Sequence, residues 1–132
     1  MPVADDVRPK RRPVYLNLVA IRLPIPGIVS FLHRVSGAVL FLFGIPLLLL
    51  AVQASLASPE SFAALKAAFA HPLARLATVG FVWAYLHHFC AGIRYLLLDV
   101  HVGDDLAPAR RSSVAVIAVS LALTLIVAVR LW

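Results

Sequence analysis

Residues 73–100, LARLATVGFVWAYLHHFCAGIRYLLLDV, form an apolar stretch long enough to cross a lipid bilayer. A helix of about 20 residues spans the hydrocarbon core, because each residue advances about 1.5 Å along the helix axis. Two histidines, His87 and His88, lie inside this stretch, away from both of its ends. Because a titratable side chain at membrane depth is costly, its presence there suggests a function.

The rest of the chain supplies two further stretches of this kind. Residues 27–52 are apolar except near their beginning, with Pro46 as a possible kink, and residues 113–131 carry no charge before Arg130. Of the 132 residues, 62% are hydrophobic, which is more than a soluble chain of this length could bury. The sequence therefore predicts an all-α membrane protein, with three transmembrane helices in a membrane domain of residues 27–132.

Between the first two predicted spans, residues 53–72 have the features of a short helix. Ser58 is a favourable N-cap, and Pro59 suits the first helical position. Apolar residues then recur at helical spacing on the side opposite Lys66. We therefore expect a short amphipathic helix that lies at the membrane interface between spans one and two.

The distribution of basic residues predicts the orientation of the chain. Most of the basic residues that flank the spans lie in the proline-containing segment 1–26 and in the loop before residue 113: Arg8, Lys10, Arg11, Arg12, Arg22, Arg110 and Arg111. The connection between the first two spans carries only Lys66 and the nearby Arg75. By the positive-inside rule, segment 1–26 is cytoplasmic and the C-terminus is periplasmic. Because the net charge of +6 is concentrated at the span ends, it does not indicate nucleic-acid binding.

His88 is the residue of the second span that best suits a metal ligand. It precedes Asp99, at the end of the span, by eleven residues, or about 16 Å of helix. Gly92, one turn away, would leave room for a flat macrocycle, whereas His87 points about 100° away and is expected to pack or hydrogen-bond. A neutral imidazole at this depth needs a polar partner or a metal, so the pattern is compatible with a haem ligand or with an interhelical hydrogen bond.

The first span begins with a polar cluster, S-F-L-H-R-V-S-G, at residues 30–37. Ser30 and Arg34 lie one helical turn apart, with His33 beside them. A hydroxyl and a guanidinium in an apolar pocket could hydrogen-bond a quinone carbonyl, and Arg34 could also neutralise a haem propionate. The alternative is that Arg34 snorkels to a lipid phosphate. His33 lies too near the helix start to be a good second axial ligand, which favours a histidine from another chain.

Four stretches of the sequence resemble the cytochrome b subunit family of succinate dehydrogenase. They are R-P-V-Y-L-N-L at residues 12–18, I-R-L-P-I at 21–25, S-F-L-H-R-V-S-G at 30–37 and H-F-C-A-G-I-R-Y-L-L-L-D at 88–99. The resemblance implies a membrane anchor of respiratory complex II in a bacterial cytoplasmic membrane. It also implies that a second anchor subunit supplies the other ligand of haem b. The flavoprotein and iron–sulfur subunits would then deliver electrons from succinate to ubiquinone.

Carried over position by position, the resemblance assigns a role to each polar residue. His88 is the axial ligand of the haem iron, Ser30 and Arg34 belong to the ubiquinone pocket, and His33 and Arg34 lie near the haem propionates. Tyr95 stands where many family members have histidine, also near the propionates. The resemblance assigns no catalytic residue to this chain.

Two alternatives to the succinate dehydrogenase anchor remain open from the sequence. One is the anchor of a quinol:fumarate reductase, and the other is a small cofactor-free membrane subunit for transport or assembly. Arg94 and Tyr95, near the end of the second span, could reach propionates or lipid headgroups. The chain has one cysteine and no dinucleotide-binding glycine loop, so succinate oxidation itself would belong to other subunits.

Overall fold

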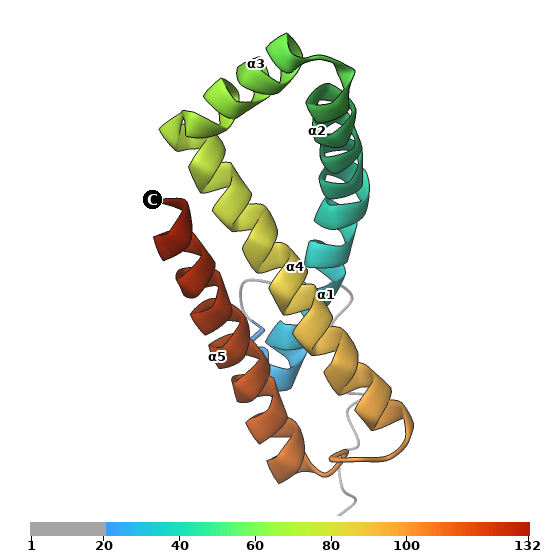
Figure 1. The fold of residues 1–132 in the computed structure, drawn as a ribbon. Coiled ribbons are helices and arrows are strands. Elements are labelled where there is room, and N and C mark those ends of the chain that lie inside the picture. The colour runs from blue at the N-terminus through green and yellow to red at the C-terminus, as the bar shows by residue number, and fades with distance from the viewer. Residues whose placement is uncertain (1–20) are drawn as a thin grey trace, which may run out of the picture.

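The computed structural model describes residues 21–132, so most of the predicted cytoplasmic segment 1–26 lies outside the described part. Figure 1 shows the arrangement of the helices. In chain order they are α1 (Ile25–Val39), the π-helical turn η1 (Leu40–Gly44), α2 (Ile45–Ala57), α3 (Pro59–Ala70), α4 (Pro72–Asp99) and α5 (Leu106–Leu131). Three continuous stretches are long and apolar enough to cross a membrane: Ile25–Ala57, Pro72–Asp99 and Leu106–Leu131. The predicted all-α fold with three spans is therefore confirmed.

The first span is a single helical stretch interrupted by a π-helical turn. Pro46 has no N–H to donate to the carbonyl of Leu42, and its ring crowds that carbonyl. The helix widens immediately before this proline, where the N–H of Ile45 donates to the carbonyl of Leu40, five residues back. Beyond this turn α2 runs apart from α4, with α3 crossing between them (Figure 1).

The short helix predicted between the first two spans is α3, and its N-terminus is capped as expected. The hydroxyl of Ser58 accepts a hydrogen bond from the N–H of Ser61 at 3.1 Å, and Pro59 takes the first helical position. Hydrogen bonds from its own backbone N–H and from the Ser58 hydroxyl lower the pKa of Glu60 below its ordinary value. The position of α3 at a membrane interface stays a prediction.

α5 packs antiparallel along α4, and small or polar residues line this contact. The buried residues of α4 are Ala84, His87, Ala91 and Arg94, and those of α5 are Ser113, Val116, Ser120 and Thr124. Small side chains let two membrane helices approach closely. The buried hydroxyls of α5 each donate to a carbonyl three or four residues earlier in the same helix, so they need no partner on α4.

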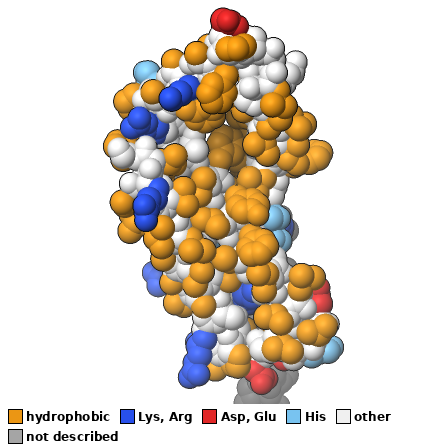
Figure 2. All heavy atoms as spheres, viewed as in Figure 1, with side chains coloured by type: hydrophobic (Ala, Val, Ile, Leu, Met, Phe, Trp, Pro, Cys, Tyr) orange, Lys and Arg blue, Asp and Glu red, His pale blue; other side chains and the backbone are white. Residues whose placement is uncertain are grey.

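The large apolar side chains point outward rather than inward. Only Val29, Ala84, Ala91 and Val116 form the buried apolar core of the described residues, whereas most leucines, phenylalanines and valines are exposed. In Figure 2, hydrophobic side chains cover most of the visible face. A surface of this kind requires lipid or partner helices around it.

Candidate functional site

His88 lies on α4 with its imidazole against α1. Nδ1 is 3.0 Å from the carbonyl oxygen of His33 and 3.3 Å from Oγ of Ser36. Because a carbonyl can only accept, Nδ1 carries the proton and donates to it. The Ser36 hydroxyl donates to the same carbonyl, at 3.0 Å. This arrangement holds one tautomer of His88, in which the lone pair is on Nε2 and is free to bind a metal.

Gly37 provides the space for this imidazole. A Cβ at position 37 would lie 2.8 Å from Cε1 of His88 and 3.2 Å from its Nδ1. Any other residue there would therefore push the ring away from the carbonyl of His33. Gly92, one turn from His88, lies beside the ring of His33, whose Nε2 a Cβ at position 92 would meet at 3.8 Å. That Gly92 leaves room for a macrocycle stays a prediction.

His33 supports His88 by stacking as well as through its carbonyl. The two ring centroids are 4.2 Å apart with an interplanar angle of 12°, and the His33 ring also contacts that of Tyr95 at 5.1 Å. Because the two rings are stacked face to face, they do not direct a nitrogen each at one point between them. His33 and His88 therefore do not form a ligand pair for a single metal ion.

His88 also lines a long apolar groove between η1, α2, α3 and α4. The groove has a volume of about 970 Å³, and its polar lining residues are Thr78, Tyr85 and His88. Cofactor-sized ligands occupy pockets of this size and character. Residues 21–132 contain no group of three or more His, Cys, Asp or Glu side chains that could hold a bare metal ion.

Ser30 and Arg34 lie together on α1, as their spacing predicted. Nε of Arg34 is 3.4 Å from the carbonyl oxygen of Ser30, and the Arg34 side chain is exposed. His33, the residue before Arg34, turns inward onto α4 instead. A ligand that contacted both Ser30 and Arg34 would lie on the outer face of α1.

Two polar residues of α4 have surroundings that the sequence did not reveal. His87 is only 1% exposed and packs against Trp83, with no hydrogen bond from either ring nitrogen to any residue between 21 and 132. Arg94, which the sequence suggested for contacts with propionates or lipid headgroups, is buried, and its Nε donates to Oγ of Ser112 at 2.9 Å. Its Nη2 donates to the carbonyl of Ala109 at 3.4 Å. Arg94 thus fastens α4 to the first turns of α5.

The chain is similar to known proteins over almost its whole length. Residues 8–127 match the family described as "Succinate dehydrogenase/Fumarate reductase transmembrane subunit". The succinate dehydrogenase cytochrome b556 subunit of Paracoccus denitrificans is 33% identical over 121 residues, which are 92% of each chain. The protein of the same name from Coxiella burnetii is 35% identical over 123 residues, 92% of this chain and 98% of that one. These matches include α1, α4 and most of α5.

Proposed function

This chain belongs to the succinate dehydrogenase/fumarate reductase transmembrane subunit family, and on that premise we propose that His88 is its axial ligand to the iron of a b-type haem. The chain is a membrane anchor of complex II. In this proposal a second anchor subunit supplies the other axial ligand. The iron–sulfur and flavoprotein subunits deliver electrons from succinate, and ubiquinone accepts them beside Ser30 and Arg34. The membrane is the cytoplasmic membrane of a bacterium.

The observation that most supports this proposal is the hydrogen bond from Nδ1 of His88 to the carbonyl of His33. Histidines that ligate metals almost always donate their second N–H to a carbonyl, a carboxylate or water, which sets the tautomer and the ring orientation. Here that hydrogen bond is present in the protein chain alone, and Gly37 leaves room for the ring. Within residues 21–132 both hydrogen-bond contacts of the ring are made by Nδ1, which is compatible with a metal at Nε2.

The remaining residues of the site orient the ligand and exclude water. When bound, the haem supplies a one-electron redox centre within the membrane. The apolar walls of the groove would keep water from the ring bonded to His88. His33 and Arg34 are the proposed contacts of the propionates, because His33 borders the His88 ring and Arg34 is the adjacent cation. Arg34 and Ser30 would hydrogen-bond a quinone carbonyl from the outer face of α1.

Comparing the variants His88→Ala and His87→Ala tests the haem ligand directly. The two residues are adjacent on α4 but have different neighbours: His87 packs against Trp83, whereas Nδ1 of His88 contacts the carbonyl of His33. The measurement is the intensity of the b-type bands in a reduced-minus-oxidised spectrum, divided by the flavin content of the complex. We expect this ratio to fall at least about tenfold in His88→Ala. His87→Ala should keep most of the bands. Equal loss in both variants, or full bands in His88→Ala, would refute the assignment.

A further inference from the structure

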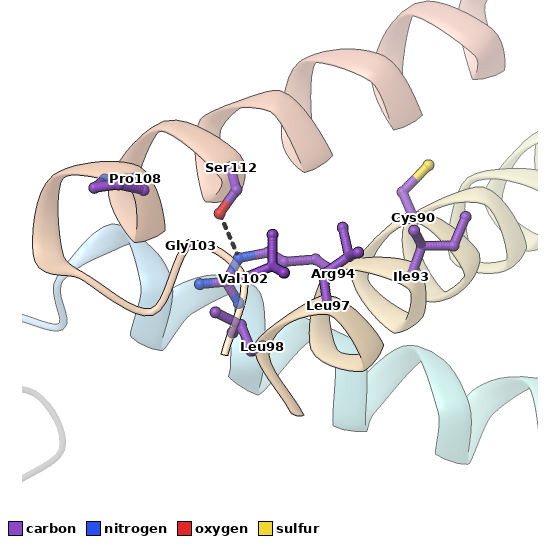
Figure 3. A pocket seen from close by; sticks show the side chains of 9 residues that line it. All are labelled: Cys90, Ile93, Arg94, Leu97, Leu98, Val102, Gly103, Pro108 and Ser112. Carbon is purple, nitrogen blue, oxygen red and sulfur yellow. Dashed lines mark hydrogen bonds between the residues drawn. The ribbon is translucent and has the colours of Figure 1, made fainter. Parts of the chain in front are cut away.

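A second pocket lies where α4 ends and α5 begins, away from His88. It has a volume of about 260 Å³, and Figure 3 shows the side chains that line it. Its walls are apolar apart from Arg94 and Ser112, and they include Cys90, Ile93 and Leu97. The proposed haem and quinone sites use none of these residues, so the pocket needs an explanation of its own.

Arg94 brings a positive charge to this pocket. The side chain is only 6% exposed, and both of its hydrogen bonds go to neutral acceptors, Ser112 and the carbonyl of Ala109. Within residues 21–132, no acidic side chain forms an ion pair with it. A guanidinium has five N–H donors, so several remain for another ligand. Because a buried charge is costly without a counter-ion, this position favours an anion.

The start of α5 adds to the positive potential at this position. Ala109 and Ser112, which accept from Arg94, belong to the first turns of α5, where the helix dipole is positive. The first turn of α5 contains no acidic residue, and Asp105 before it makes no capping hydrogen bond. The first turn of α5 therefore places a partial positive charge near Arg94.

The depth and the surroundings of the pocket indicate which anion it would meet. Arg94 lies five residues before the end of α4 at Asp99, about 7.5 Å along the axis. A helix of 28 residues is about 42 Å long and exceeds the hydrocarbon core by roughly 6 Å at each end. Arg94 therefore lies close to the depth where acyl chains meet headgroups. Ile93, Leu97 and Val102, which border the pocket, are exposed apolar residues.

We propose that the pocket between the end of α4 and the start of α5 binds the phosphate of a membrane phospholipid, with Arg94 as its counter-ion. Basic pockets between transmembrane helices commonly bind lipid headgroups. The acyl chains would extend along the apolar surface of Ile93 and Leu97. Arg94 would then have two tasks, holding α4 to α5 and holding a lipid at their junction. Binding of a phospholipid here does not require haem, so the two assignments can fail separately.

Alkylation of Cys90 provides a local test, because it is the only cysteine of the chain and it lines the pocket. The purified complex is stripped of lipid in an alkyl maltoside, and its reaction with N-ethylmaleimide is followed by mass spectrometry of the Cys90 peptide. Phosphatidylglycerol should slow the reaction about fivefold or more, as expected when most sites are occupied. Diacylglycerol with the same acyl chains, which lacks the phosphate, should not slow the reaction. Inorganic phosphate should not slow it either.

Three variants connect this protection to the pocket. Arg94→Gln should abolish the effect of phosphatidylglycerol, and Arg111→Gln, which removes an exposed cation of α5, should keep it. If Arg94→Gln fails to assemble, Ile93→Trp tests whether the lipid occupies this pocket. The added indole fills the pocket and leaves Arg94 in place. That variant should react slowly whether or not lipid is added.

Several results would overturn the proposal. One is an alkylation rate in the unmodified complex that phosphatidylglycerol does not change. Equal protection by diacylglycerol would mean that the pocket only takes up apolar chains, and equal protection by inorganic phosphate would make it a site for free anions. A lipid effect that survives in both Arg94→Gln and Ile93→Trp would place the lipid elsewhere.

Discussion

α4 contacts α1 on one side and α5 on the other, and polar residues have opposite roles at the two contacts. At α1, His88 uses one ring nitrogen for a hydrogen bond to the carbonyl of His33 and leaves the other free beside a groove. At α5, the buried hydroxyls donate within their own helix and Arg94 donates to Ser112. The α4–α5 contact therefore stabilises the helix pair, whereas the α1–α4 contact orients the imidazole that we propose as a ligand.

The largest expected effect comes from adding one carbon atom to the α1–α4 contact. Gly37→Ala would place a Cβ 2.8 Å from Cε1 of His88, so the imidazole must move away from the carbonyl that orients it. We expect haem affinity to fall about 10–100-fold, as for other losses of outer-shell support, measured from b-type absorbance per flavin. Gly80→Ala is the control, because no atom lies within 4 Å of its added carbon. Full haem content in Gly37→Ala would contradict this account.

Removing the arginine of the other contact should affect stability instead. Arg94→Gln loses hydrogen bonds from a buried charge, and we expect about 2 kcal/mol less resistance to unfolding of the α4–α5 pair. The measurement is the thermal midpoint of the lipid-stripped complex in detergent, with Arg111→Gln, an exposed neighbour, expected to change stability by no more than about 0.5 kcal/mol. If Arg94→Gln lost its haem while its midpoint stayed unchanged, the division of roles between the two contacts would be wrong.

Substitutions on the outer face of α1 should slow quinone reduction without slowing succinate oxidation. Arg34→Leu removes a cation whose proposed partner is a quinone carbonyl, and the expected loss in kcat/KM for ubiquinone is about tenfold. Ser30→Ala should act in the same direction but more weakly. Succinate oxidation by an artificial dye, which bypasses the quinone, serves as the internal control. Unchanged quinone kinetics in both variants would remove these residues from the pocket.

The smallest effect is expected in α3, which belongs to neither contact. Ser58→Ala removes the acceptor of the Ser61 N–H and should destabilise the first turn of α3 by about 1 kcal/mol. Amide hydrogen exchange of residues 60–62 would detect this as faster exchange. Ser55→Ala is the matched control, because the Ser55 hydroxyl only donates to the carbonyl of Val52. Equal exchange rates in both variants would show that the cap does not hold the turn.

The helices themselves were largely predictable, because hydropathy and capping act locally. Ser58 and Pro59 marked the start of α3 correctly, and Pro46 marked the interruption of the first span although not its π-helical form. The start of α5 was the main deviation, since the apolar run begins at residue 113 but the helix begins at Leu106. Hydropathy indicates only the part of a helix that lies in the hydrocarbon core. The first residues of α5 include charged side chains outside that core, so hydropathy does not mark the start of the helix.

The site was only partly predictable, because its geometry depends on two helices at once. The spacing of Ser30 and Arg34 on α1 was evident from a single helix, and the structure places them together. That Gly37 makes room for the His88 ring depends on how α1 and α4 cross. The inward turn of Arg94 likewise depends on acceptors in α5, eighteen residues further along the chain. No pattern within α4 alone contains this information.

A density map of the intact complex would test the central assignment most directly, at the groove beside His88. This account predicts a porphyrin in that groove whose iron is bonded to Nε2 of His88, with Nδ1 still donating to the carbonyl of His33. A histidine of the second anchor subunit would complete the coordination from the opposite side. A His88 ring that faces acyl chains or protein side chains, with no porphyrin beside it, would contradict the account.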